Sequence, residues 1–280
     1  MFDRRFRRLA AGGHDTGPHA HCQKRQPMLP PREKEGYNHC MGFLDWWFPR
    51  ICKLCNQTFD GDIDVCRHCL AALPYNRWPC QRCGLPLPQP AIDLCQRCQT
   101  KPPAFTRTIA PLLFQDMIRD WVHAIKFGNG CREAQLLGRL LTTSVRQAGD
   151  VLPDVLVPVP LTLRRLWRRG HNQALLIAQP IAKALEIPLC RTGVRRVGRQ
   201  RPQRGQTRKA RDQSVRGAFR VTREWHGHVA LIDDVMTTGA TVSELARILL
   251  GAGASRVDVW VAARVDARAR VDTRVPESRR

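Results

Sequence analysis

Eight of the 12 cysteines in this 280-residue chain stand in four Cys-x-x-Cys pairs, separated by 10, 10 and 11 residues. Two thiolates from one tight turn and two from another form the tetrahedral four-sulfur site that structural zinc prefers. Eight ligands complete two closed sites and leave no open coordination position for catalysis. The spacing therefore predicts two structural zinc ions, held by Cys52, Cys55, Cys66, Cys69, Cys80, Cys83, Cys95 and Cys98.

The spacing leaves the pairing of the four knuckles open. Sequential ribbons join the first pair with the second and the third with the fourth, whereas a cross-brace alternates them. The near-equal gaps permit both, and we favour the sequential arrangement. A disulfide framework needs an oxidising compartment, but residues 1–20 lack the apolar segment of a secretory signal. The sequence therefore predicts zinc ribbons in a cytoplasmic protein.

A second motif joins an apolar strand, two acids and a Thr/Gly loop that opens a helix. Ligands of open α/β sheets bind beyond the carboxyl ends of the strands. Small loop residues let backbone N–H groups approach a phosphate, and a helix N-terminus favours its charge. Adjacent acids there accept hydrogen bonds from ribose hydroxyls. We expect a sugar-phosphate site made of Asp233, Asp234, Val235, Met236, Thr237, Thr238, Gly239, Ala240 and Thr241.

Alternating strands and helices must position these residues. Apolar segments predict strands over 155–157, 194–197, 218–221, 229–232 and 256–263. Helical periodicity predicts helices over 115–127, 133–146, 174–185 and 241–250. Such alternation is typical of a parallel sheet with helices on its faces, so the predicted fold class is α/β.

Composition divides the chain into five expected regions. Residues 1–40 mix Arg, Gly, His and Pro without periodicity, so we expect a disordered extension, with Met41 as the natural start. The remaining regions are a double zinc-ribbon module over 41–105, a helical connector over 106–150, a sheet domain over 151–265 and a charged tail over 266–280.

The positive charge of the chain is concentrated in one segment. The whole sequence has a formal charge of +22, and residues 161–223 hold 17 Lys and Arg residues against two acids. Such a segment favours a polyanionic partner, although a solvated basic surface is the alternative. Trp167, Phe219 and Trp225 are its candidates for stacking on bases. The basic residues expected to contact pyrophosphate or nucleic acid are Arg164, Arg165, Arg168, Arg169, Arg201, Arg204, Arg208, Lys209 and Arg211.

Composition also excludes two classes of protein. The hydrophobic fraction of 43% is too high for wholesale disorder. No apolar run approaches the ~18 residues that a membrane-spanning helix needs. The sequence therefore predicts a folded protein without a membrane span.

The strand, acid pair and Thr-Thr-Gly loop resemble the signature of the type I phosphoribosyltransferases, over roughly residues 150–263. The resemblance implies a phosphoribosyltransferase-like parallel sheet domain. It implies that Asp233 and Asp234 hold the ribose hydroxyls of phosphoribosyl pyrophosphate (PRPP), with Mg(II) bound alongside. It also implies that residues 237–241 take the 5′-phosphate.

Beyond residue 40 the chain is similar to the ComF/GntX family of competence-associated phosphoribosyltransferase-like proteins. The similarity lies in the double zinc ribbon, in Ile125-Lys126-Phe127, in 157–161 with 169–174, and in Gln203, Arg211 and 217–219. The chain departs at Ser214, where the family often has Asn, and in the polar 206–208 segment. The similarity implies that the residues facing the pyrophosphate are Lys126, Pro158, Val159, Pro160 and Leu161.

The family resemblance implies a competence factor that binds PRPP and single-stranded DNA and assists DNA uptake and natural transformation. It also suggests replication or recombination proteins as partners. No local signature marks a nucleobase pocket, so PRPP binding is better supported than transferase turnover. The alternative is a metabolic phosphoribosyltransferase that transfers phosphoribosyl from PRPP to a nucleobase. A third possibility is a zinc-ribbon docking protein with a degenerate PRPP fold.

Overall fold

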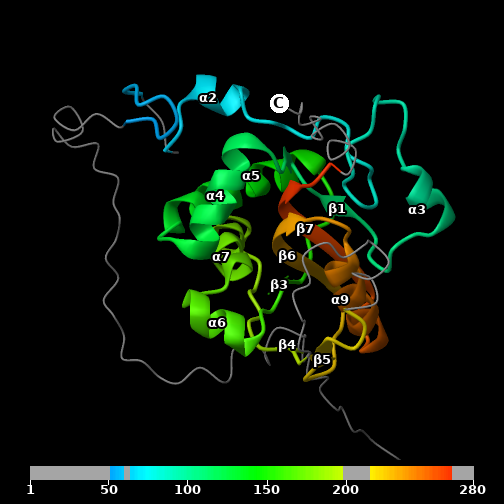
Figure 1. Cartoon of the computed structure of the whole chain (residues 1–280). Helices are drawn as coiled ribbons and strands as arrows, with labels where there is room; N and C mark the ends of the chain where they lie inside the picture. Colours follow the sequence, from blue (N-terminus) through cyan, green and yellow to red (C-terminus); the bar gives the residue numbers. More distant parts are fainter. Residues whose placement is uncertain (1–50, 60–63, 198–214, 267–280) are drawn as a thin grey trace, which may run out of the picture. The chain divides into compact units, whose positions relative to one another are not determined.

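The computed structural model describes residues 51–59, 64–197 and 215–266, which are coloured along the chain in Figure 1. Several predictions therefore lie outside the described residues. They concern the extension over 1–40, the start of the zinc module, all but one residue of the charged tail, and Arg201, Arg204, Arg208, Lys209 and Arg211.

A parallel sheet forms the centre of the α/β domain. Its strand order is β1-β7-β6-β3, and β2 pairs with β7 beyond the end of β1. Every pairing in this sheet is parallel, as predicted. The long strands are apolar along most of their length because helices cover both faces. The strands are β1 (Thr108–Ile109), β2 (Leu112–Leu113), β3 (Val155–Pro158), β6 (His228–Met236) and β7 (Arg256–Arg264).

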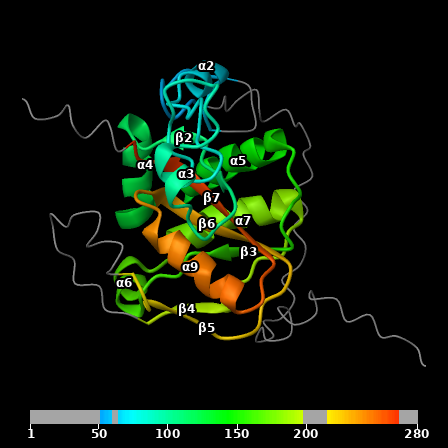
Figure 2. The same cartoon turned by 90° about the vertical axis from the view of Figure 1, so that its right-hand side faces the viewer.

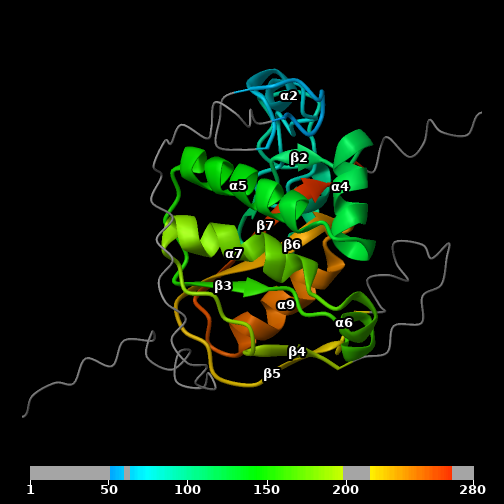
Figure 3. The ribbon, with the colours of Figure 1, turned by 90° about the vertical axis from the view of Figure 1, so that its left-hand side faces the viewer.

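Helices lie on both faces of this sheet. Figure 3 shows α5 (Cys131–Ala148) and α7 (Gln173–Leu185) in front of it, with α4 (Asp116–Phe127) beside them. Figure 2 shows α9 (Ala240–Gly251) on the opposite face. Helices α5 and α7 approach closely at Gly138, where an added Cβ would lie 2.4 Å from Pro180 Cγ.

The structure adds elements that periodicity did not predict. Residues 106–150 contain the two expected helices, but they also supply β1 and β2 to the sheet. The predicted strands near 194 and 219 form a separate antiparallel pair, β4 (Val194–Arg196) with β5 (Phe219–Val221). A short helix, α6 (Leu163–Arg169), follows β3. Strand β6 continues to Met236, four residues past its predicted end.

The two ribbons each contain one short helix, α2 (Arg67–Ala71) and α3 (Gln96–Thr100). The first ribbon shares the main hydrophobic core, because Val65 and Leu73 belong to the cluster that contains Leu112 and Ile118. The second ribbon has its own small core around Leu87. Among the described residues, no helix has the length and apolarity to cross a membrane.

Candidate functional site

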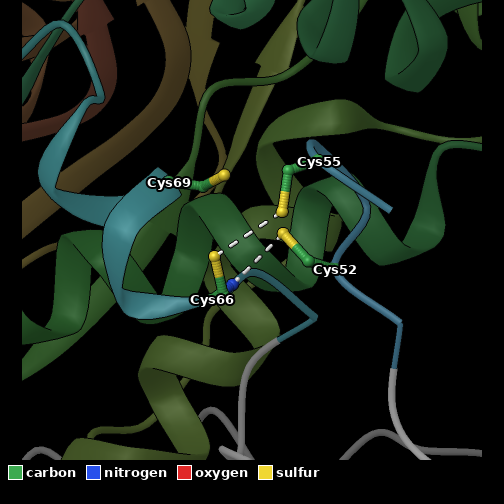
Figure 4. A group of neighbouring side chains, drawn as sticks. All are labelled: Cys52, Cys55, Cys66 and Cys69. Atoms are coloured by element: carbon green, nitrogen blue, oxygen red, sulfur yellow. Dashed lines mark hydrogen bonds between the residues drawn. The ribbon is translucent and has the colours of Figure 1, made fainter. Parts of the chain in front are cut away.

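The eight predicted ligands form two compact clusters of four cysteines. The sulfurs of each cluster lie within 4.8 Å of one another, and each cluster joins consecutive pairs, so the ribbons are sequential. Figure 4 shows the first cluster, where the Sγ atoms of Cys55 and Cys66 are 3.8 Å apart. The corresponding distance between Cys83 and Cys95 is 3.6 Å. A Zn–S bond of about 2.3 Å gives a tetrahedron edge of about 3.8 Å, so both clusters have the size of a zinc site.

The electrostatics of the clusters also fit a bound cation. Donation from the Cys83 thiol is the main influence that lowers the pKa of Cys80 to about 4. Burial opposes ionisation of Cys52, but backbone N–H donors, Cys66 first, lower its pKa to about 6. Burial raises the pKa of Cys69 and of Cys98 to about 12. Four thiolates repel one another in so small a space, and a divalent metal compensates their charge.

The two acids of the second motif lie in the last part of β6. Successive residues of a strand point to opposite faces, and Asp234 is buried while Asp233 is half-buried. The Oδ1 atom of Asp233 accepts a hydrogen bond from the N–H of Asp234, at 2.9 Å. The acids are therefore held at the carboxyl edge of the sheet, where α/β folds bind ligands.

Positive charges surround this acid pair. Lys126, near the end of α4, forms an ion pair with Asp234, with 2.6 Å between Nζ and Oδ2. Arg169 on α6 lies near enough to Asp234 for the two charges to interact. Burial, and then the charge of Asp234, raise the pKa of Asp233 well above its ordinary value, and Lys126 opposes this rise. Two acids kept together against this cost are typical of a functional site.

The Thr/Gly loop connects the acids to α9. Gly239 has φ of +80° and is the N-cap residue of this helix. The hydroxyl of Thr238 accepts a hydrogen bond from the N–H of Ala240, at 3.3 Å. A left-handed glycine after a turn is the conformation in which successive N–H groups converge on an anion. The predicted residues 237–241 therefore form a loop and helix start of the expected kind.

The loop after β3 is tied to the same edge. The N–H of Val159 donates to the carbonyl of Ile232, at 2.9 Å. The side-chain amide of Asn172 donates to the carbonyl of Val159 at 3.1 Å, while its Oδ1 caps α7 at Ala174 N–H. His171 Nε2 lies 2.5 Å from the carbonyl of Ile125. These contacts bring together the predicted pyrophosphate loop, Lys126 and the acid pair.

A cleft of about 530 Å³ opens beside Lys126. Its size suits a sugar phosphate or a nucleotide. The guanidinium of Arg169 lies 5.2 Å from the ring centroid of Phe127 across it, and donates to Gln173 Oε1 at 3.0 Å. The cleft is therefore basic and lined by Lys126, Phe127, Gly128, Asn129, Arg168, Arg169 and His171.

Two arginines at this edge were missed by the sequence analysis. Arg264, the last residue of β7, is 2% exposed and hydrogen-bonds the loop carbonyls of Met236 and Thr237. Arg97 on α3 donates to the carbonyl of Thr238, at 3.0 Å. Asp233 was predicted because it is a charged residue near the end of an apolar strand. Arg264 ends the apolar strand β7 in the same way, so the same rule would have identified it.

Known proteins share both parts of this chain. A double zinc ribbon domain model matches residues 43–99, and a phosphoribosyl transferase domain model matches residues 171–277. The DNA utilization protein YhgH of Escherichia coli is 35% identical, over 76% of this chain and 96% of that protein. Competence protein F of Haemophilus influenzae is 32% identical, over 81% of this chain and 95% of that protein. Competence protein ComFC of Bacillus subtilis is 27% identical, over 72% of this chain and 90% of that protein.

Among solved structures, a glutamine PRPP amidotransferase from B. subtilis complexed with ADP and GMP is 24% identical over 46% of this chain and 26% of its own. Its TM-score of 0.32 is too low for a detailed comparison.

The parallel sheet and its acid-bearing strand define a phosphoribosyltransferase-like domain, here joined to two structural zinc ribbons. The match to this chain covers at least 95% of the E. coli and H. influenzae relatives. The chain belongs to the ComF/GntX family.

Proposed function

We propose that this protein binds PRPP with Mg(II) at the carboxyl edge of its sheet. The observation that carries the proposal is the Asp233–Asp234 pair at the end of β6, with Lys126 on Asp234 and the Thr/Gly loop next in sequence. The carboxylates accept hydrogen bonds from the ribose hydroxyls. The N–H groups and hydroxyls of residues 237–241 bind the 5′-phosphate.

The basic groups around the acids suit the remaining part of PRPP. Lys126 and Arg169 would neutralise the pyrophosphate, which the backbone near Val159 would face, and Mg(II), when bound, would supply further charge compensation. Turnover would break the bond between the anomeric carbon and pyrophosphate oxygen and form one to a nucleobase nitrogen. The pyrophosphate would leave with the bonding electrons. Such chemistry depends on positioning and electrostatics, which these residues can provide.

We further propose that α6 binds single-stranded DNA, as part of a cytoplasmic role in DNA uptake and natural transformation. Relatives named as a DNA utilization protein and as competence proteins support this role. On α6, Trp167 is 87% exposed and lies between Arg165 and Arg168, and Leu163 before Arg164 is 74% exposed. A highly exposed aromatic side chain among cations is typical of surfaces that stack bases and contact phosphates.

Replacing Trp167 with alanine tests this surface. Because stacking on one base contributes ~1–3 kcal/mol, Trp167→Ala is expected to weaken oligonucleotide binding about 5- to 150-fold. Stability changes little, since the side chain is exposed. Fluorescence anisotropy with a labelled single-stranded oligonucleotide measures the loss. Trp78→Ala, on a ribbon tryptophan that is 43% exposed, is the matched control and leaves DNA affinity unchanged. If wild type and Trp167→Ala bind the oligonucleotide with equal affinity, Trp167 on α6 does not contact DNA as proposed.

Lys126 is expected to lower the pH range over which PRPP binds. Asp233 must be ionised to accept ribose hydroxyls fully, and its raised pKa means that affinity increases as pH rises through that pKa. Lys126 lowers this pKa, so Lys126→Met moves the increase to higher pH. The variant also weakens binding about tenfold at neutral pH through loss of a charged partner. Calorimetric titrations with Mg·PRPP between pH 5 and pH 9 measure both changes. A profile with unchanged midpoint would contradict this role.

One titration series tests the proposed function. Zinc-loaded protein is titrated with labelled single-stranded DNA, with and without Mg·PRPP, and pyrophosphate release is assayed over a panel of nucleobases. Binding of both ligands without release supports the proposal. Base-dependent release without DNA binding would favour the metabolic phosphoribosyltransferase instead.

A further inference from the structure

Three consecutive carbonyl groups of the Thr/Gly loop are held by two arginines from other parts of the chain. Arg264 Nη1 donates to the carbonyl of Met236, at 2.8 Å, and to that of Thr237. Arg97 Nη1 donates to the carbonyl of Thr238, at 3.0 Å. The oxygens of residues 236, 237 and 238 are therefore all fixed by guanidinium groups.

Both arginines connect the loop to the second zinc ribbon. Arg97 lies between the ligands Cys95 and Cys98 on α3. Arg264 Nε donates to the carbonyl of Cys83, at 2.9 Å. The buried guanidinium of Arg264 therefore connects a zinc-ligand residue of the second ribbon with the loop. The first ribbon contacts a different part of the domain, through the ion pair of Lys53 with Glu133 on α5.

The carbonyl contacts have a consequence for the N–H groups. In a planar trans peptide the C=O and N–H bonds point in opposite directions. Holding the carbonyls of 236, 237 and 238 toward the arginines therefore turns the N–H groups of Thr237, Thr238 and Gly239 away from them. None of the hydrogen bonds found among residues 51–59, 64–197 and 215–266 uses these three N–H groups. Three neighbouring N–H donors beside a left-handed glycine are the kind of set that binds a phosphate.

We propose that Arg264 and Arg97 are positioning residues that hold the loop from behind and aim its N–H groups at the phosphate position. The second zinc ribbon is then the structural support of the phosphate loop, whereas the first ribbon supports α5. The identity of the anion rests on the proposed PRPP function, but the positioning of the loop does not.

Arg97→Ala tests this support without disturbing the buried core, because the contact with Thr238 is solvent-exposed. Lys53→Ala is the matched control, since it removes a cation that joins the first ribbon to the domain. Arg264→Lys keeps the charge but cannot reach all of the carbonyls. NMR order parameters of the backbone amides of residues 236–241 report loop order, calorimetry with Mg·PRPP reports affinity, and native mass spectrometry reports zinc content.

We expect lower order parameters in the loop of Arg97→Ala and of Arg264→Lys, with two zinc ions retained in Arg97→Ala. PRPP affinity is expected to fall about two- to tenfold for Arg97→Ala, which corresponds to the free energy of one hydrogen bond. The fall is expected to be larger for Arg264→Lys. Lys53→Ala changes neither quantity. Loop order parameters in Arg97→Ala that equal those of wild type overturn the proposal, whatever Arg264→Lys does. If wild type binds no PRPP but the two arginine variants still lower the loop order parameters, the positioning stands and the proposed function fails.

PRPP binding should also stabilise the zinc site of the second ribbon, because the coupling between two binding sites is reciprocal. Saturating Mg·PRPP is expected to raise the chelator concentration that removes half of one of the two zinc ions at equilibrium, and Cys80→Ser identifies that ion as the one in the second ribbon. Equal protection of both zinc ions, or of neither, would contradict the coupling.

Discussion

Replacing Asp233 and Asp234 together with asparagine is expected to reduce the affinity for Mg·PRPP by about 100-fold or more. Each carboxylate accepts charge-assisted hydrogen bonds from the ligand, and such bonds contribute roughly 1.5–3 kcal/mol apiece. Asparagine keeps the shape of the side chain but removes the charge, so the loss comes from the chemistry of the acids. Calorimetric titration of the zinc-loaded variant measures the change.

The same variants separate function from stability. Because burial raises the pKa of Asp233 in the folded protein, ionising this group opposes folding as pH rises above its unfolded value of about 4. Asp233→Asn removes that opposition, so its thermal unfolding temperature at pH 7 should equal or exceed that of wild type. Asp120→Asn, an exposed acid on α4, is the matched control and leaves PRPP affinity unchanged. Retained PRPP affinity in the double variant would refute the site.

Removing zinc is expected to unfold the two ribbons. It should also lower the free energy of unfolding of the α/β domain. Ribbons of this size bury too little apolar surface to fold alone, and structural zinc supplies roughly 10–16 kcal/mol of binding free energy in zinc-finger peptides. Cys52 and Cys66 are also members of the main hydrophobic core, so loss of the first site propagates into α4 and α5. Calorimetric unfolding before and after treatment with a strong chelator measures the effect.

Low pH should release zinc, as a chelator does, because protons compete with the metal for the cysteine thiolates. Native mass spectrometry is expected to count two zinc ions in wild type and one in Cys80→Ser. Cys131→Ser, which changes an exposed cysteine outside both clusters, keeps two. An unfolding transition that is the same with and without zinc would contradict a structural role for the metal.

Local patterns predicted the elements that carry the chemistry. The apolar run before Asp233 marked β6, and the Cys-x-x-Cys spacing marked all eight ligands, because strand period and ligand spacing are properties of neighbouring residues. The helices α4, α5, α7 and α9 were predicted within two residues at each end, since their apolar faces repeat at helical spacing. The parallel sheet followed from the alternation of these elements.

Features that depend on distant contacts were not predictable in the same way. Strands β1 and β2 are two residues each and exist because they pair with β7, about 150 residues later. Helix α6 buries no residue completely, so it has no apolar periodicity to detect. The contacts of Arg264 with Cys83 and with Met236 join segments far apart in sequence. The choice between sequential and cross-braced ribbons likewise needed three-dimensional distances.

The most direct test of the proposed function is isothermal titration calorimetry of full-length, zinc-loaded protein with PRPP and Mg(II). The proposal predicts saturable binding of one PRPP per chain, strengthened as pH rises through the pKa of Asp233 and lost in the Asp233→Asn, Asp234→Asn double variant. A folded wild-type protein that retains two zinc ions but shows no binding at millimolar PRPP would contradict it.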